Sequence, residues 1–566
     1  MRYIACLLLC ASSVCGLPQV VANQEEGATP ASSQDGAQFA ALYASWDAAV
    51  ENGRFEDVLN LASPDATLER GSSKLPLRDV IAQMKTILQA GARATQKTSI
   101  TSIHVAGPQA RVSTRTQSTV VVGGQKHDGV ESSEDTWVRT AHGWRLSTSK
   151  IVGSREIIPP TDNETAQAVA AELKARAHSI SIGTAGPVDD LEPFGQAIGG
   201  ARVVALGEAT HGTSEFNVAK ARIIEYLVTR KGFTVLAVEA NWPETLGIDR
   251  YIKTGDGDPK ALLTSLQMYP LRTREMRGVI EWMRAYNRKL SSSKLAFTSF
   301  DMQRSEAAVA QVLAYLKLTA PGQAGIVEGA YRRVRELSRE PGVPDPQAGA
   351  AAEEAQHVIR IMDESRETLV RASSERDWNH ARRGAQIALQ AMQLKIPGQR
   401  PGYRDEMMAN NLTWLLDTAC ATEKVIAWAH NGHIGFGSGV GSRPMGSYLR
   451  ARLGRAFYAV GFSVAGGEVR AVGTNGFGVY SMPDAAPGSG AGVLSLSGMP
   501  LFFLDMRSLP SGTVLAKWMA EPHCFYTVGA RWNDAAPEDN TSVFSMSRSF
   551  DGLVFVREGH ASRVLK

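Results

Sequence analysis

The stretch from residue 201 to residue 217, ARVVALGEATHGTSEFN, constrains the fold of this chain more than any other. Its apolar run from Val203 to Leu206 predicts a short buried strand, and a glycine-flanked loop follows that strand. Thr213 and Ser214 then stand where the side chain that caps a helix is expected. We therefore predict a strand, a tight loop and a helix, which is the unit from which open α/β sheets are built.

The loop carries two titratable residues, Glu208 and His211, three positions apart. A carboxylate directly after a strand lies at the carboxyl edge of the sheet, where open α/β proteins bind ligands. His211 precedes a helix amino terminus, whose positive dipole end disfavours an imidazolium, so we expect a neutral ring that can accept a proton. A surface ion pair beside a turn is the simpler alternative for so short a motif.

Length and charge narrow the class of protein. A chain of 566 residues predicts two or three domains. The net charge is only +3, without a dense block of Lys and Arg, which argues against nucleic acid as a partner.

Three of the five cysteines lie in the first 15 residues. The other two, Cys420 and Cys524, do not make a disulfide framework, and the sequence leaves open whether they pair.

The first 22 residues have the pattern of a signal peptide. Arg2 supplies the positive start, Ile4 to Val14 is apolar but too short to cross a bilayer, and Val20 to Ala22 offers a small-residue cleavage site. We therefore expect an exported protein, periplasmic or secreted, with no transmembrane segment in the mature chain. Residues 23–36 are rich in Gln, Glu, Ser, Ala and Gly, which predicts a disordered tether.

Residues 37–153 have the pattern of a small α+β domain. The apolar spacing predicts helices and then β-rich segments, over Phe39–Asn52, Phe55–Leu61, Leu77–Ala90, Thr98–Val105, Gln109–Val121 and Ser132–Ser147. This order resembles the SnoaL-like (NTF2-like) cone fold. The resemblance implies an accessory module that holds a small ligand or allows dimerisation. Residues 154–186 are expected to be a linker.

From residue 187 to residue 566, apolar strands alternate with helical patterns, which predicts a mostly parallel sheet. Residues 307–393 contain little but helical periodicity, so we expect an inserted helical layer there. The predicted fold class is thus α/β with a mostly parallel sheet and an inserted helical layer, preceded by the cone-like domain. The expected strands cover Val203–Leu206, Phe233–Val238, Leu295–Phe300, Lys424–Ala429, Phe457–Phe462, Glu468–Val472, Leu501–Leu504 and Leu553–Arg557.

Four of these strands end in titratable residues, which are Glu208, Glu239, Asp301 and His430 in chain order. If the strands are parallel neighbours, the four side chains meet in one crevice at the carboxyl edge of the sheet. Carboxylates buried together acquire different pKa values, which suits paired acid and base roles. For Asp301 alone, capping of the next helix is the preferred interpretation.

Five motifs in register resemble those of the erythromycin esterase family, from about Asp189 to the carboxyl end. The resemblance implies an erythromycin-esterase-like hydrolase domain over residues 187–566. It also implies that a macrolide lactone is hydrolysed without a serine nucleophile, with a histidine activating water, as in macrolide inactivation and antibiotic resistance. The motifs are GEATHG (Gly207–Gly212), VEAN (Val238–Asn241), RDEMMANN (Arg404–Asn411), WAHNGH (Trp428–His433) and MGSYL (Met445–Leu449).

Carried over to this sequence, the resemblance makes His211 the general base. Glu208 and Glu239 would orient His211 or the water. His430 would be the second essential imidazole, which polarises the carbonyl or protonates the leaving alkoxide. A base with a near-neutral pKa is what attack of water on an ester carbonyl needs.

Three further residues are candidates for substrate binding. His433 would line the cleft, Arg404 would contact an oxyanion or the substrate, and Lys220 follows the first motif closely enough to reach the same cleft. The simpler interpretations are a local ion pair between Arg404 and Asp405 at a helix start and a backbone hydrogen bond from His433.

Other functions remain open at this point. No cofactor is expected, but the same Glu and His residues could bind a divalent metal such as zinc or manganese, as a metal-dependent hydrolase or a metal- or haem-binding protein. A non-catalytic ligand-binding protein is a third hypothesis. A serine hydrolase is disfavoured, because the segment around Ser463 (GFSVA) lacks the second glycine of a nucleophile elbow. The expected partner is a small-molecule ester or lactone.

Overall fold

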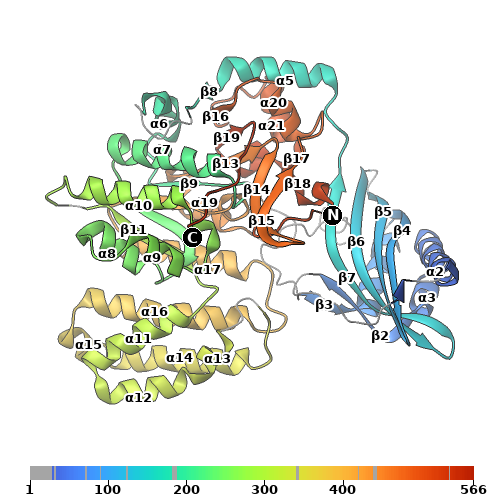
Figure 1. The fold of residues 1–566 in the computed structure, drawn as a ribbon, viewed down its shortest axis with the longest axis horizontal. Helices are drawn as coiled ribbons and strands as arrows, with labels where there is room; N and C mark the ends of the chain where they lie inside the picture. The colour runs from blue at the N-terminus through green and yellow to red at the C-terminus, as the bar shows by residue number, and fades with distance from the viewer. Residues whose placement is uncertain are drawn as a thin grey trace. The chain divides into compact units, whose positions relative to one another are not determined.

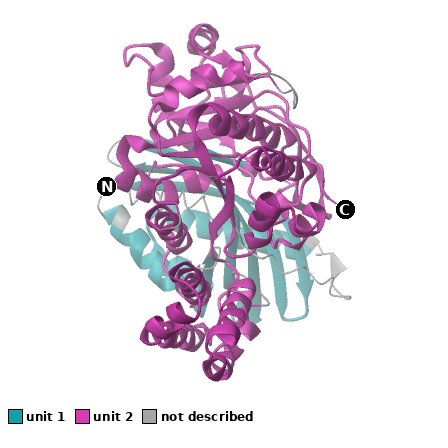
Figure 2. Ribbon diagram, turned by 90° about the vertical axis from the view of Figure 1, so that its left-hand side faces the viewer, with its two compact units in different colours: residues 1–159, 541–543 teal, residues 160–540, 544–566 magenta. Residues whose placement is uncertain are grey.

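The chain forms two compact units, residues 1–159 with 541–543 and residues 160–540 with 544–566 (Figure 2). The predicted signal peptide lies outside the described residues, and so does most of the predicted tether. The computed structural model describes residues 29–30, 33–70, 73–89, 91–122, 125–181, 188–292, 294–338, 343–418, 420–437, 443–534 and 536–565.

The first unit confirms the predicted α+β fold. Its helices pack on a seven-stranded sheet through a core that includes Phe39, Trp137 and Trp144. The helices are α2 (Ser33–Glu51), α3 (Phe55–Asn60) and α4 (Leu77–Gln89). The strands, in sheet order, are β1 (Thr29–Pro30), β4 (Arg93–Ala106), β5 (Gln109–Val122), β6 (Gln125–Thr140), β7 (Gly143–Ile157), β2 (Ala62–Arg70) and β3 (Ser73–Pro76).

Three features of this unit differ from the expected pattern. Helix α2 begins at Ser33, inside the predicted tether, and strand β7 continues to Ile157, inside the predicted linker. Strands β2 and β3 were not predicted. The sequence of β2, ASPDATLER, contains a proline and two acidic residues, and of its described side chains only Ala62 and Ala66 are buried, so it lacks the apolar alternation by which a strand is recognised.

The second unit contains an eight-stranded sheet and confirms the predicted α/β class. Six neighbouring strands are parallel, the seventh pairs antiparallel with the sixth, and the eighth pairs antiparallel with the seventh. Figure 1 shows this sheet. The strands, in sheet order, are β11 (Ala296–Asp301), β10 (Phe233–Asn241), β12 (Lys424–Trp428), β9 (Val203–Leu206), β13 (Phe457–Val464), β19 (Gly552–Val556), β16 (Leu501–Asp505) and β8 (His178–Ser179).

Apolar residues cover both faces of this sheet. Along β9, Val204 and Leu206 enter one core, and Val203 and Ala205 enter the other, as expected for a parallel strand buried on both sides. The helices of this α/β body are α5 (Asn163–Arg176), α6 (Glu192–Ile198), α7 (Ser214–Lys231), α8 (Leu246–Thr254), α9 (Pro259–Ser265), α10 (Arg274–Asn287), α17 (Tyr403–Asp417), α18 (Asn431–Ile434), α19 (Met445–Leu453), α20 (Gly490–Ser495), α21 (Val514–Ala520) and α22 (Met546–Ser549).

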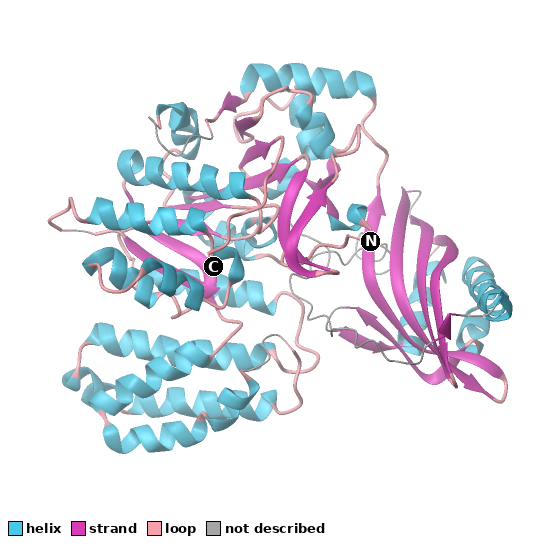
Figure 3. Cartoon of the chain, viewed as in Figure 1, coloured by secondary structure: helices cyan, strands magenta, loops and turns pink. Residues whose placement is uncertain are grey.

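The inserted helical layer is confirmed and lies between β11 and α17 in the chain. Figure 3 shows it as a purely helical body below the sheet. It has a core of its own, built around side chains such as Tyr331 and Trp378. Its helices are α11 (Glu306–Thr319), α12 (Pro321–Ala330), α13 (Arg332–Leu337), α14 (Ala348–Glu364), α15 (Arg366–Ala372) and α16 (Glu375–Leu394).

An antiparallel hairpin, β14 (Gly467–Gly473) and β15 (Gly476–Met482), leaves the sheet after β13. Two further strands, β17 (Pro522–Tyr526) and β18 (Thr541–Ser545), precede the final helix and strand. Cys420 and Cys524 are both free thiols. Within the described ranges, every helix is too short or too polar to span a bilayer.

Candidate active site

The carboxyl ends of four adjacent parallel strands carry the four titratable residues named from the sequence. Glu239 lies two residues before the end of β10, Asp301 ends β11, and Glu208 and His430 each follow their strand by two residues. Strands β11, β10, β12 and β9 are consecutive neighbours, so the four residues follow one another along a single edge of the sheet. All four are buried.

The first group of the site is centred on Glu208. Its Oε1 lies 2.5 Å from Nδ1 of His211. Its Oε2 pairs with Nζ of Lys220 from α7 and accepts a 3.0 Å hydrogen bond from the indole Nε1 of Trp428 at the end of β12. The ammonium of Lys220 also lies 4.1 Å from the centroid of the Trp428 ring, a cation–π contact. Three donors from three elements thus hold one carboxylate.

The ion pair between Glu208 and Lys220 sets the charges in this group. Burial would raise the pKa of Glu208, but the charge of Lys220 and the hydrogen bond from His211 outweigh it and hold that pKa at about 2. Burial lowers the pKa of Lys220 to about 8, against the opposing attraction of Glu208. Glu208 therefore stays ionised over the neutral range, so it orients a neighbour and does not take up protons.

The contact with Glu208 defines the chemistry of His211. An ionised carboxylate accepts the proton on Nδ1, which leaves the lone pair of a neutral imidazole on Nε2. The backbone nitrogen of His211 donates to the carbonyl of Val528 at 3.3 Å, which holds the loop. At Gly212 a Cβ would overlap the backbone of Arg470, so the close approach of β14 requires glycine.

The second group is centred on Arg404 of α17. Its Nε and Nη2 form a bidentate pair with Asp301, at 3.1 and 2.7 Å, and Nη2 also lies 2.7 Å from Oε1 of Glu239. Nη1 lies 3.0 Å from Nε2 of His433. Asp405 accepts from Nδ1 of His433 at 2.8 Å and from the backbone nitrogen of Met445.

Ion pairing also sets the pKa values of Glu239 and His433 in this group. Burial would raise the pKa of Glu239, but the charges of His433 and Arg404 hold it well below its usual range. Burial would lower the pKa of His433, but Asp405 and Glu239 raise it well above its ordinary value. Glu239 therefore stays ionised over the neutral range and anchors the guanidinium of Arg404.

His430 lies between the two groups. Its ring is 5.0 Å from the ring of His211, centroid to centroid, and its backbone nitrogen donates to Oε2 of Glu239 at 2.9 Å. Its Nδ1 accepts from the backbone nitrogen of Gly432 at 3.1 Å, which places the proton on Nε2, 3.4 Å from the carbonyl of Ala209. The Nε2–H of His430 therefore faces the backbone of the loop that carries His211.

Three interpretations made for this site from the sequence are wrong. The ring of His433 does not bond to the backbone, because its two nitrogens contact Asp405 and Arg404. Asp301 does not cap the next helix, because Ser305 stands at the N-cap of α11 and Asp301 pairs with Arg404. Arg404 and Asp405 do not form a local ion pair with each other, because each bonds to a residue from another element.

Other site residues are placed as follows. Lys220 is fully buried behind Glu208, a position that fits support of the carboxylate better than contact with a substrate. Trp428 and Asp405 were not nominated as site residues, although both lie in the quoted motifs WAHNGH and RDEMMANN. Their position within those motifs was the only signal that could have found them.

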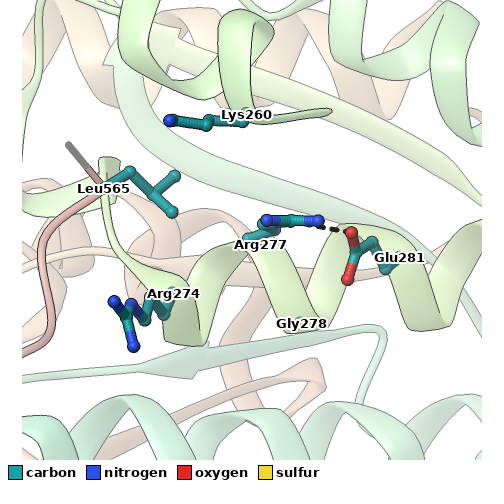
Figure 4. Close-up of a pocket in the computed structure, with 6 residues that line it drawn as sticks. All are labelled: Lys260, Arg274, Arg277, Gly278, Glu281 and Leu565. Atoms are coloured by element: carbon teal, nitrogen blue, oxygen red, sulfur yellow. Dashed lines mark hydrogen bonds and ion pairs between the residues drawn. The ribbon is translucent and has the colours of Figure 1, made fainter. Parts of the chain in front are cut away.

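The described residues also bear on the rival chemistries. Ser463 is buried within strand β13 and not on a strand-to-helix turn, so it has no nucleophile-elbow geometry. Among the described residues, no group of three or more His, Cys, Asp or Glu side chains has a geometry that could hold a metal ion. A pocket of about 460 Å³ between α9 and α10 includes no site residue (Figure 4).

The fold and the site define an α/β protein with an acid–base cluster at the carboxyl edge of its sheet, a class that includes hydrolytic enzymes. The family model "Erythromycin esterase" matches residues 228–559, and a SnoaL-like domain model matches residues 31–150. Because the first match covers more than half of its length, the chain belongs to the erythromycin esterase family. The SnoaL-like assignment of the first unit is likewise confirmed.

Related proteins include hydrolases. The chain is 23% identical to the putative hydrolase YbfO of Bacillus subtilis (strain 168) over 305 residues, which cover 48% of this chain and 67% of that protein. It is 24% identical to erythromycin esterase type II of Escherichia coli over 366 residues, 57% of this chain and 84% of the relative. Together with the family, these relatives support a hydrolase.

Solved structures share the fold of the second unit. A Bacillus cereus protein aligns with a TM-score of 0.63 and 26% identity, over 70% of this chain and 99% of that protein. A mutant of the erythromycin esterase EreC, in its open conformation, aligns with a TM-score of 0.54 and 17% identity, over 69% and 99% of the two chains.

Proposed function

We propose that this chain hydrolyses a carboxylic ester or lactone by attack of a water molecule that His211 activates. The observation that carries the proposal is the 2.5 Å contact between Nδ1 of His211 and Glu208, with Lys220 behind it. An ionised carboxylate holds the imidazole in the tautomer whose Nε2 can accept a proton. Such general-base help contributes about 10²–10⁴ in rate.

The reaction balances with the residues present. Nε2 of His211 takes a proton from water as the water oxygen attacks the carbonyl carbon, and the carbonyl oxygen becomes an oxyanion. The protonated His211 then gives its proton to the leaving alkoxide as the C–O bond breaks, and the acid and alcohol depart. The pair of His211 and Glu208 returns to its starting charge after each turnover.

His430 and Arg404 are the proposed donors to the oxyanion. His430 directs its Nε2–H toward the same loop that carries His211, and Arg404 presents a guanidinium that is 13% exposed. Preorganised donors of this kind are worth roughly 3 kcal/mol each in the transition state. Because the guanidinium of Arg404 donates hydrogen bonds to Asp301 and Glu239, it is held in place before the substrate binds.

The finer parts of the proposal come from the relatives and the sequence. Erythromycin esterases are among the relatives, so a macrolactone, with macrolide inactivation as the outcome, belongs to the proposed substrate class. The signal-peptide pattern supports an exported, periplasmic or secreted location. The SnoaL-like unit supports dimerisation through that unit.

The test is a screen of the purified protein against a panel of lactones and acyl esters, followed by one turnover in ¹⁸O water. Direct attack by water puts ¹⁸O into the acid product in the first turnover. If that acid carries no ¹⁸O, a carboxylate of the protein is the nucleophile, and the proposal is wrong. Mass spectrometry of the protein during turnover checks for a covalent acyl adduct, which the proposal does not allow.

A metal-dependent reaction is the alternative to test, although no three His, Cys, Asp or Glu side chains among the described residues have a geometry that could hold a metal ion. The contacts of the described residues favour the first candidate, because Lys220 and Arg404 already occupy oxygens of Glu208 and Glu239 that a metal would need. Activity that survives dialysis against a chelator agrees with His211-activated water. If the activity is lost on dialysis and zinc or manganese restores it, the proposed mechanism is wrong and the reaction depends on a metal.

A further inference from the structure

The hairpin of β14 and β15 has one buried and one exposed face. Residues opposite each other in its register share a face, and Val469 and Ala471 enter the core. On the other face, Val472 stands opposite Phe477, and Arg470 stands opposite Val479. Phe477 and Val479 are each 46% exposed, and Phe477 is the one aromatic side chain among the large exposed apolar residues in the described part of the chain.

Backbone hydrogen bonds connect this hairpin to the loop that carries His211. Val528 donates to the carbonyl of Ala209 at 2.7 Å, and His211 donates to the carbonyl of Val528. Three residues further on, Val472 of β14 pairs with Arg531. The loop, the segment 528–532, β14 and β15 therefore run side by side, and β15 lies two strand spacings, roughly 10 Å, from that segment.

Tyr269 extends the exposed face toward the same segment. Its ring lies 5.0 Å from the ring of Phe477, edge to face, and its hydroxyl donates to the carbonyl of Ala530 at 3.1 Å. Nε of Arg470 donates to the carbonyl of Ser562 at 2.8 Å, and its guanidinium carbon lies 5.8 Å from the centroid of the Phe477 ring, so a positive charge borders this face. The result is an apolar surface, here named the shelf, made of Tyr269, Val472, Phe477 and Val479.

We propose that the shelf binds the apolar acyl group of the ester, so that the enzyme prefers substrates with a long hydrocarbon acyl chain over short ones. This inference rests on the proposed function. Exposed apolar patches mark binding sites, and substrate sites place apolar walls beside a few polar groups. The acyl group is the assigned occupant because the shelf is continuous, through the 528–532 segment, with the loop whose histidine would activate the attacking water.

The test compares kcat/KM for p-nitrophenyl octanoate and p-nitrophenyl acetate in the full chain. Phe477→Ala and Val479→Ser should each lower the octanoate-to-acetate ratio about five- to tenfold, mainly through KM, with acetate hydrolysis within about twofold of wild type. Leu496→Ala, which removes an exposed leucine elsewhere, is the matched control and should leave the ratio unchanged. A ratio unaffected by both shelf substitutions overturns the proposal, as does an equal loss on both esters.

A binding measurement separates the shelf from the catalytic proposal. In a His211→Asn protein, monomethyl octylphosphonate should bind more tightly than monomethyl methylphosphonate, and adding Phe477→Ala should remove about five- to tenfold of that preference. This outcome supports the shelf even if no ester is hydrolysed. If ester hydrolysis requires His211 but Phe477→Ala leaves the chain-length preference unchanged, only the shelf is refuted. If Phe477→Ala instead turns a dimer into a monomer with unchanged selectivity, the shelf covers a second copy and the proposal is overturned.

Discussion

Glu208 is the residue on which the charges of the first group depend. It balances the buried ammonium of Lys220 and orients His211 at the same time. Removing one partner of a buried ion pair leaves an uncompensated charge, which costs roughly 3–5 kcal/mol. We therefore expect Glu208→Gln to lower the free energy of unfolding by about that amount and also to abolish hydrolysis.

The double variant Glu208→Gln, Lys220→Met separates these two effects. Without either charge the interior no longer holds an unpaired ion, so the double variant should regain most of the lost stability. Urea unfolding measures this recovery. Hydrolysis should stay absent, because no carboxylate orients His211. A double variant that is stable and active would show that Glu208 serves the fold alone.

The lowered pKa of Glu208 also predicts that the protein loses stability at acidic pH. Its folded pKa of about 2 lies below the ordinary value of 4.5, so the folded state binds this proton more weakly than the unfolded state does. The stabilisation, of the order of 3 kcal/mol, is complete above the ordinary value and is lost as the pH falls toward the folded value.

Urea unfolding at about pH 5 and about pH 3 measures this loss of stability. Wild type should lose more stability between the two conditions than the Glu208→Gln, Lys220→Met protein does. Equal losses in the two proteins would mean that other carboxylates, such as Glu239, account for the acid sensitivity.

At the scale of elements, the motif loop and β14 depend on glycine at position 212. A methyl group there would overlap the backbone of Arg470, which rigid backbone cannot relieve. We expect Gly212→Ala to displace the hairpin or the loop, to lower stability by about 1–3 kcal/mol and to reduce hydrolysis strongly. Chemical denaturation and kcat/KM report the two effects.

Gly325→Ala is the matched control for that substitution. Gly325 lies in the exposed interior of α12, where an added Cβ meets nothing within 4 Å. Alanine should therefore stabilise the protein by about 0.5–1 kcal/mol through its helix propensity and leave hydrolysis unchanged. If both substitutions behave alike, the close approach at Gly212 does not matter.

Elements with uniform apolar runs could be predicted from the sequence, and most side-chain partners could not. The runs that lead to Glu208, Glu239, Asp301 and His430 identified four neighbouring parallel strands, because strands buried on both faces of a sheet are rich in apolar residues. The pairing of Asp301 with Arg404 was missed, because it joins residues 103 positions apart and no local pattern records such a contact.

At the scale of the whole molecule, the two units have separate hydrophobic cores. The core of the first unit, around Phe39 and Trp137, contains no residue of the catalytic sheet. All site residues belong to the second unit, whose two sheet faces are covered by its own side chains. Units with separate cores are expected to fold and act with considerable independence.

This separation predicts the result of deleting residues 1–159. The remaining chain should keep hydrolysis of a small ester within about threefold of the full chain, since no group that acts on the carbonyl is removed. Measured kcat/KM for one ester in both proteins decides the matter. A large loss with the second unit still folded would show that the SnoaL-like unit takes part in the site.

The most direct test of the central claim is the rate of ester hydrolysis in His211→Asn, measured beside His142→Asn, which changes an exposed histidine in the first unit. Asparagine keeps a hydrogen-bond donor for Glu208 but cannot accept the proton of water. The account predicts that kcat/KM falls about 10²–10⁴-fold in His211→Asn and is unchanged in His142→Asn. A folded His211→Asn protein that hydrolyses the ester at the wild-type rate would contradict it.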